Sequence, residues 1–177
     1  MRTSVCLSLL VLSAGIAPSH ADSLFETYFS KAAGGTPCYA RQYTAAHLAK
    51  NPKQQVTAFE IDFEPANPDG VLNTAKRFEL GVGVQKRGSA EWFTNAGYCT
   101  MRAGGFDCGL DGDGGQFRLQ PASGGRLRLE LTRDTMGFEG ENSFFEFGGK
   151  ISDDNVFLLS PADRKVCDAS TTDVQRP

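Results

Sequence analysis

Apolar and polar residues alternate one by one in two neighbouring runs of the chain, residues 116–120 and 126–132. A period of two places the apolar side chains on one face of a β-strand and the polar side chains on the other. Between the runs, Pro121 to Gly125 supplies the serine and glycines that a tight turn needs. The pattern therefore predicts an antiparallel β-hairpin with one buried side and one solvent-facing side.

The same alternation recurs elsewhere along the chain. Further strands are predicted at residues 59–64, 78–85, 91–94, 98–102, 144–151 and 156–160. In the second of these runs, Gly81 and Gly83 indicate a bend or a close backbone approach. About eight short strands with glycine-rich turns are typical of an antiparallel β-barrel or sandwich. We expect a mainly β domain, with a small up-and-down barrel of the lipocalin-like type as the first choice.

Two short helices are expected near the N-terminus, as accessories to the β body. Residues 22–36 carry four apolar side chains at the spacing of one helix face: Leu24, Phe25, Tyr28 and Phe29. Residues 43–50 resemble a second helix, with Thr44 as its N-cap and Asn51-Pro52 as its stop.

The first residues have the features of a secretory signal peptide. Arg2 is followed by an apolar stretch from Val5 to Ile16, and then by the small-x-small pattern Ser19-His20-Ala21. The apolar stretch is too short for a membrane span. We therefore expect residues 1–21 to be removed, no membrane insertion, and a single secreted or periplasmic domain over residues 22–177.

Four cysteines follow the predicted signal peptide, namely Cys38, Cys99, Cys108 and Cys167. An even number in an exported protein implies two disulfides, for which three connectivities exist. We favour Cys99–Cys108, because neighbouring strands across a tight turn bring two Cα atoms close enough. The second bridge is then Cys38–Cys167, which ties the two ends of the domain together.

The charge of the chain excludes some classes of partner. The net charge is −3 at pH 7, and basic residues form no cluster. This composition argues against binding to nucleic acid and to anionic membrane surfaces.

One acidic turn resembles part of a calcium-binding loop. Asp107, Asp111 and Asp113 alternate with glycines, as in loops that supply oxygens to a hard cation. The glutamate expected at the end of such a loop is missing, and Asp-Gly pairs are common in ordinary turns. We expect a plain turn and no metal or other cofactor, with calcium as the alternative.

Candidate catalytic groups are sparse. Glu139, Glu141 and Glu146 could join the aspartates as acid and base of a hydrolase, but the sequence alone cannot set their separation. His47 is the only histidine after residue 21, and no nucleophile turn such as GxSxG occurs. We expect His47 to lie partly exposed on its short helix, and we assign no catalytic residue.

Two aromatic groups are candidates for a binding surface. Tyr39, Arg41 and Tyr43 form either a recognition patch or a lid over one barrel end, and we favour the lid. In a strand, Phe144 and Phe145 must face opposite sides, so one of them belongs to a second apolar layer or to an exposed patch.

These features favour a non-enzymatic extracytoplasmic binding module. It would hold a small apolar ligand inside the barrel or present loops to a protein partner, for example as an enzyme inhibitor. The alternatives are a hydrolase that acts through surface carboxylates and a calcium-stabilised structural protein.

Overall fold

The computed structural model describes residues 20–30, 37–67 and 69–168. In chain order the elements are α1 (His20–Phe29), β1 (Cys38–Gln42), α2 (Ala45–Lys50), β2 (Val56–Asp62), β3 (Phe78–Lys86), β4 (Trp92–Arg102), β5 (Gly105–Leu110), β6 (Gln116–Ala122), the 3-10 turn η2 (Ser123–Gly125), β7 (Arg126–Leu131), β8 (Met136–Glu139), β9 (Phe144–Phe147) and β10 (Val156–Ala162).

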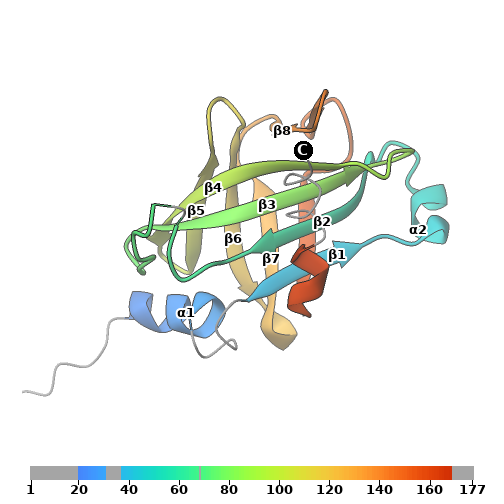
Figure 1. Ribbon diagram of the computed structural model, residues 1–177. Helices are drawn as coiled ribbons and strands as arrows, with labels where there is room; N and C mark the ends of the chain where they lie inside the picture. The colour runs from blue at the N-terminus through green and yellow to red at the C-terminus, as the bar shows by residue number, and fades with distance from the viewer. Residues whose placement is uncertain (1–19, 31–36, 68, 169–177) are drawn as a thin grey trace, which may run out of the picture.

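Eight of these strands close into an antiparallel barrel (Figure 1). Strands β1 to β7 follow one another around the wall, and β10 completes it between β7 and β1. The remaining two strands, β8 and β9, form a hairpin that joins the barrel at β4. Of the two predicted architectures, the structure therefore adopts the up-and-down barrel.

Aromatic rings fill the inside of this barrel. The largest side chains that are almost completely buried include eight phenylalanines: Phe29, Phe59, Phe78, Phe106, Phe117, Phe138, Phe147 and Phe157. They come from the inward positions of the alternating strands and from the two segments that close the barrel ends. Burial of so many rings supplies the main favourable free energy of the fold.

Helix α1 closes one end of the barrel, which we call the helix end. The connections β2–β3, β4–β5 and β6–β7 lie at this end. The ring of Phe29 packs 5.0 Å from that of Phe78 and 5.2 Å from that of Phe106. Tyr39 of β1 adds a hydrogen bond, because its buried hydroxyl donates to the carbonyl oxygen of Tyr28 over 2.9 Å. The predicted helix is thus confirmed, but it is part of the core and not an accessory.

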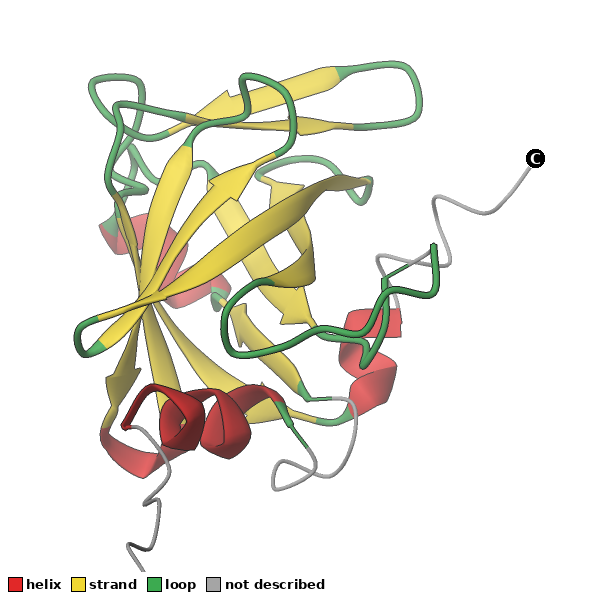
Figure 2. Ribbon diagram, turned by 90° about the vertical axis from the view of Figure 1, so that its left-hand side faces the viewer, coloured by secondary structure: helices red, strands yellow, loops and turns green. Residues whose placement is uncertain are grey.

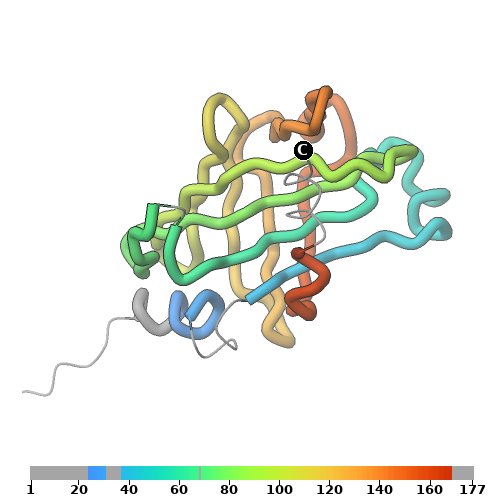
Figure 3. The backbone as a smooth tube through the Cα atoms, in the orientation of Figure 1, coloured from blue at the N-terminus to red at the C-terminus, as the bar shows by residue number. Residues whose placement is uncertain are grey.

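The β8–β9 hairpin closes the opposite end, which we call the hairpin end (Figure 3, where the hairpin is orange and α1 is blue). The rings of Phe138 and Phe147 stack 5.5 Å apart, and Phe147 lies 5.8 Å from Phe157 of β10. Phe59 of β2 meets both hairpin rings edge-on. Both ends of the barrel are therefore closed by phenylalanine side chains.

Both predicted disulfides are present. Cys99 and Cys108 are directly opposite in the β4–β5 register, with Cα atoms 4.1 Å apart. Cys38 at the start of β1 is bonded to Cys167, 129 positions later, with Cα atoms 5.9 Å apart. The second bridge fastens the helical turn at 164–168 to the barrel wall at the helix end.

Several predicted elements differ from the observed ones. The prediction of a lid at residues 39–43 is wrong, since Cys38–Gln42 is barrel strand β1 and α1 closes that end. Strand β8 was not predicted, because its alternation of Met136 and Phe138 with Gly137 and Glu139 spans only four residues. The separate strands predicted at 91–94 and 98–102 are one strand, β4. It continues through Gly97, whose missing side chain makes room for Val82 and Phe117.

The second predicted helix is confirmed as α2. The hydroxyl oxygen of Thr44 accepts the backbone N–H of His47 over 3.2 Å, which satisfies an otherwise unpaired donor at the helix start. Asn51 caps the other end, where its N–H donates to the carbonyl of Leu48. The helix lies in the β1–β2 connection, at the hairpin end of the barrel.

The predicted signal peptide falls largely on residues 1–19, which are outside the described residues. Helix α1 begins at His20, so the predicted cleavage after Ala21 lies in its first turn. The buried side chains of α1, Phe25, Tyr28 and Phe29, all follow that point. Among the described residues, no helix is long and apolar enough to cross a membrane.

Candidate functional site

An open cleft of about 500 Å³ lies on the outside of the barrel at the hairpin end. It separates the β5–β6 turn from the start of the β7–β8 connection. Its lining residues are Gly109, Leu110, Gly112, Asp113, Gly115, Gln116, Arg133, Asp134 and Thr135. Three glycines and several exposed polar side chains form this surface, so backbone groups are accessible beside the charges.

The shape of the cleft depends on the glycines of the β5–β6 turn. Gly112 and Gly115 have φ values of 61° and 99°, which favour glycine because it lacks a Cβ. A Cβ on Gly115 would lie 2.2 Å from the carbonyl oxygen of Thr135, so the turn packs directly against the opposite wall. The N–H of Gly137 also donates to the carbonyl of Gly114 over 2.9 Å. These contacts fix one wall of the cleft against the other.

The charged groups of the cleft favour a cationic ligand group. Asp113 lies on one wall and Asp134 on the other, and both are exposed. The one cation among the lining residues is Arg133, whose Nε donates to Oε1 of Gln116 over 3.2 Å. Carboxylates from two segments of one cleft can bind a lysine or arginine side chain by charge-assisted hydrogen bonds.

Gly109 forms part of the cleft floor, and the fold does not require a glycine there. Its φ is not positive, and a Cβ at this position would meet nothing within 4 Å. A glycine inside a strand weakens the strand, and it often marks the approach of a ligand or of another backbone. The open space above Gly109 therefore points to the cleft as a contact surface.

Tyr98 lies beside this floor, directly opposite Gly109 in the β4–β5 register. Its ring is partly exposed, and the guanidinium carbon of Arg77 lies 6.0 Å from the ring centroid. Partial burial raises the pKa of the Tyr98 hydroxyl, and the negative charges of Asp111 and Glu79 raise it further. The phenol therefore stays neutral and can act as a hydrogen-bond donor on the outer surface beside Gly109.

The aspartates proposed as part of a calcium loop are separated by the structure. Asp107 belongs to β5, where its carboxylate pairs with Arg102 and Arg118, each over 3.1 Å. Asp111 and Asp113 remain in the β5–β6 turn. Within the described ranges, no group of three or more histidine, cysteine, aspartate or glutamate side chains is arranged to hold a metal ion.

The glutamates proposed for a hydrolase lie on the β8–β9 hairpin. Glu139 ends β8, Glu146 lies in β9, and Glu141 is in the connecting turn. The N–H of Glu141 donates to the carboxylate of Glu91 over 2.9 Å. Neither Glu139 nor Glu141 is among the cleft residues, so the cleft does not bring them together with Asp113.

His47 and the aromatic-arginine group form a small stack on the surface. The rings of His47 and Tyr43 stack with their centroids 4.7 Å apart. The guanidinium carbon of Arg41 lies 5.0 Å from the centroid of the same Tyr43 ring. Nε2 of His47 lies 2.9 Å from Oε1 of Gln54. Tyr39 is buried in the barrel core at the helix end, whereas Arg41 is exposed at the far end of the same strand. The three residues proposed as one patch therefore do not form one surface.

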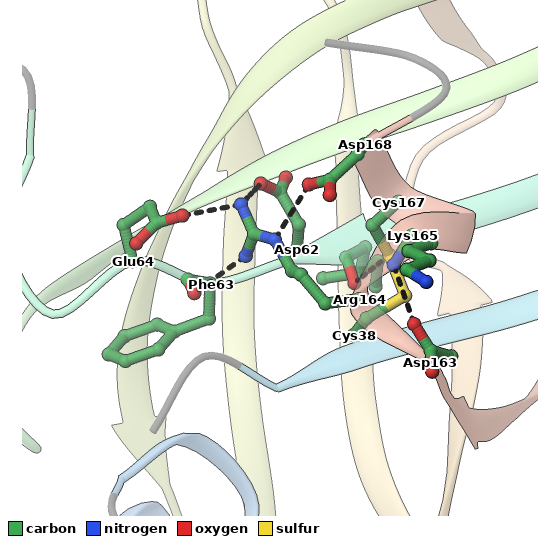
Figure 4. The surroundings of a disulfide bond; sticks show 10 residues. Cys38, Asp62, Phe63, Glu64, Asp163, Arg164, Lys165, Cys167 and Asp168 are labelled. Carbon is green, nitrogen blue, oxygen red and sulfur yellow. Dashed lines mark hydrogen bonds and ion pairs between the residues drawn. A yellow bond between two sulfur atoms is a disulfide. The ribbon is translucent and has the colours of Figure 1, made fainter. Parts of the chain in front are cut away.

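A charge cluster at the helix end could not be predicted from the sequence. Arg164 pairs with Asp62, Glu64 and Asp168, beside the Cys38–Cys167 bridge (Figure 4). Burial raises the pKa of Asp62, and the positive charge of Arg164 opposes that rise. The cluster joins the C-terminal turn to β2, 102 positions earlier in the chain. Its contacts are all internal, which indicates a structural role.

Among the described residues, three large apolar side chains are more than 60% exposed, and they lie in two regions. Val71 and Leu72 lie in the β2–β3 loop at the helix end, 63% and 72% exposed. Phe144 on the β8–β9 hairpin is 63% exposed, while its neighbour Phe145 is 2% exposed. The two phenylalanines therefore face opposite sides, as their adjacent positions in a strand predicted.

No protein-family model, curated protein or solved structure matches this chain.

Proposed function

We propose that this protein is an exported, non-enzymatic binding protein that recognises another protein through the outer surface of its barrel. Its export is supported by the signal-like residues 1–21 and by two disulfides, which form in oxidising compartments. One observation carries the proposal: the barrel interior is occupied by aromatic rings, whereas the cleft that could receive a partner is on the outside.

A small apolar ligand would need room inside the barrel, as in larger ligand-carrying barrels. Here Phe29 and Phe78 occupy the helix end, and Phe138 and Phe147 occupy the hairpin end. Each of these rings is at most 1% exposed. Displacing one of them to admit a ligand would expose a large apolar surface, at a cost of about 2–3 kcal/mol per ring. This favours external recognition over the internal carrier.

The cleft fits a segment of a protein partner. Its volume of about 500 Å³ is enough for a few side chains, and its glycines leave backbone groups open to a second backbone. Asp113 and Asp134, which both line the cleft, favour a lysine or arginine of the partner. Tyr98, which lies opposite Gly109 in the strand register, adds an exposed aromatic residue of the type that dominates protein interfaces.

Filling the cleft tests this function. Gly109→Trp introduces a large side chain into open space, so the barrel should fold while the cleft is blocked. Thr100→Trp places the same side chain at another exposed position, in β4 and outside the cleft lining. Both variants are cross-linked in the exported fraction of the producing host and compared with the unmodified protein.

We expect one protein adduct to form with the unmodified protein and with Thr100→Trp, and to be lost with Gly109→Trp. Circular dichroism and thermal unfolding confirm that all three proteins are folded. An adduct that persists in Gly109→Trp removes the cleft as the binding site. A bound small molecule in place of a protein adduct would overturn the proposed function.

A further inference from the structure

The β8–β9 hairpin has a second face that is not needed to close the barrel (Figure 2, across the top). Met136, Phe138, Phe145 and Phe147 point inward and are buried. The alternate positions, Gly137, Glu139, Phe144 and Glu146, therefore point outward. The side chains of Glu139, Phe144 and Glu146 are all exposed.

The outer edge of β9 is unpaired within the described part of the chain. β9 is the last strand in the sheet order, and its registered partner is β8. The N–H of Gly140 donates to the carbonyl of Ser143 over 2.8 Å, which sets the alternation of hydrogen bonds in the hairpin. By that alternation, the N–H and C=O groups of Phe144 and Glu146 point away from β8. They form a short row of donors and acceptors at the edge.

The open edge ends shortly after β9. The N–H of Gly148 donates to the hydroxyl of Ser152 over 3.0 Å, and the N–H of Gly149 donates to Asn155 over 2.7 Å. A partner strand could therefore form hydrogen bonds to Phe144 and Glu146, and would end before Gly148.

Phe144 is held in place although it is exposed. A Cβ on Gly137 would lie 2.5 Å from the Phe144 ring, so the ring lies directly over the Gly137 backbone. Its other side faces solvent. Because the ring is already positioned, a partner that packs on it loses little side-chain entropy, which is typical of binding hot spots.

The charge of this face selects the partner. Glu139, Glu141 and Glu146 are exposed on the hairpin, and Glu91 lies against its turn. Charged residues on a short edge strand oppose pairing with an identical strand, because like charges would meet. A lysine- or arginine-containing strand would instead bring opposite charges together.

We propose that the edge of β9 accepts an extended, basic segment of a partner protein as an additional antiparallel or parallel strand, with Phe144 as its apolar anchor. The inference rests on the proposed function, since it assumes external recognition of a protein, and it adds a second place of contact and an extended conformation of the partner segment.

The exposed β2–β3 loop is a weaker candidate for such pairing. Asn67 and Val71 pair with each other through both backbone and side-chain groups, and Thr74 pairs with Arg77. These bonds occupy backbone groups that a partner strand would need. The loop offers Val71 and Leu72 as exposed apolar side chains, and Leu72→Ala therefore serves as a matched control.

The test is a titration of the full exported protein, followed by NMR of its backbone amides. The probe is a seven-residue peptide that alternates lysine and valine, and the comparison peptide alternates glutamate and valine. We expect the basic peptide to shift the amide signals of Phe144 and Glu146 and to slow their hydrogen exchange. We expect the acidic peptide to leave both signals unchanged.

Two variants separate the contributions of the ring and the edge. Phe144→Ala should weaken binding of the basic peptide about tenfold, an effect of the size typical of an interface hot spot. Glu146→Pro removes an outward N–H but leaves the hydrogen bonds between β8 and β9 in place, and it should weaken peptide binding as much as Phe144→Ala does. Leu72→Ala should bind as the unmodified protein does. Thermal unfolding of each variant shows whether it is folded.

The proposal is overturned if the basic peptide shifts neither amide, or if both peptides bind equally. It is also overturned if the two signals depend on protein concentration without peptide, since a second copy would then occupy the edge. In either case an adduct that is sensitive to Gly109→Trp would leave the proposed function intact.

Discussion

The two ends of the barrel are closed by the same residue type but in different ways. At the helix end, α1 packs Phe25 and Phe29 onto the barrel, and nearby contacts hold the closure from several sides. These include the Cys38–Cys167 bridge, the Tyr39 hydrogen bond and the ion pairs of Arg164. At the hairpin end, β8 has one register pair with the barrel wall, Thr94 with Glu139. Hydrogen bonds from Asn95 to the carbonyl of Gly137 and from the N–H of Gly137 to the carbonyl of Gly114 complete its attachment.

The two ends of the barrel therefore differ in role, because only the hairpin end combines closure with a surface suited to binding. The hairpin uses its inner face to fill the barrel, and its outer face carries an exposed ring and two glutamates, with a third glutamate in the turn. The cleft lies beside it, where Thr135 lines the cleft and its hydroxyl donates to Glu146 of β9. The helix end therefore mainly stabilises the fold, and the hairpin end carries the proposed binding surface.

The largest expected effect concerns the disulfide at the helix end. Replacing Cys38 and Cys167 with serine should lower the free energy of unfolding by about 5 kcal/mol, because the bridge closes a long loop. Replacing Cys99 and Cys108 should cost about 2.7 kcal/mol, because that loop is short. Urea unfolding of both double variants measures the two losses. Equal losses would contradict the special role of the helix-end bridge.

A comparison of the two closures comes next. Phe29→Ala and Phe147→Ala should each destabilise the protein by about 3–5 kcal/mol, since each leaves a cavity in a filled barrel. Only Phe147→Ala should also weaken binding of the basic peptide, because Phe147 positions β9. Urea unfolding and peptide titration at a temperature where both variants are folded provide the measurements. Equal peptide affinity in both would break the division between the ends.

A pair of glycines in β5 gives a smaller contrast. A Cβ on Gly105 would lie 2.3 Å from the carbonyl oxygen of Leu119, whereas one on Gly109 meets nothing. Gly105→Ala should therefore cost about 1–3 kcal/mol by overpacking. Gly109→Ala should be neutral or should stabilise by up to about 1 kcal/mol, since glycine weakens a strand. A large loss in Gly109→Ala would show that the fold itself requires this glycine.

The smallest expected effect is a pH dependence at the hairpin end. Burial raises the pKa of Asp154 above its usual value of 3.8, although the N–H of Gln55 donates to its carboxylate over 2.6 Å. A raised pKa in the folded state means that folding favours the protonated acid. Its stabilising contribution is complete below pH 3.8 and is lost as the pH rises through the folded-state value.

Asp154→Asn removes this titration. The stability of the unmodified protein relative to Asp154→Asn should therefore fall as the pH increases from about 3.8. Urea unfolding at a series of pH values measures the difference. A relative stability that rises over this range would show that hydrogen bonds to the carboxylate outweigh its burial.

Local patterns explain which parts of the fold could be predicted. The β6–β7 hairpin and the Cys99–Cys108 bridge depend on neighbouring residues, and the alternation reveals them. The helix at α1 was also predicted, but its position inside the barrel end was not, because Phe25 and Phe29 meet partners far away in the chain. Strand β1 was missed, since Tyr39 is its one large inward side chain.

The binding surface was less accessible to sequence reasoning. The alternation predicted that Phe144 and Phe145 face opposite sides, but it could not identify the exposed one. Asp113 and Asp134 line one cleft because the β5–β6 turn packs against the β7–β8 connection, a contact between segments distant in the sequence. The pairing of Arg164 with Asp62 spans 102 positions and leaves no local signal.

The central claim is that aromatic side chains occupy the barrel interior, so that recognition takes place outside. Native mass spectrometry of the protein, purified from its producing host with both disulfides intact, tests this most directly. The account predicts a polypeptide mass without any small molecule. The result that would contradict it is a small molecule that stays bound to the unmodified protein and is lost from the Phe157→Trp variant, in which a bulkier side chain fills the interior.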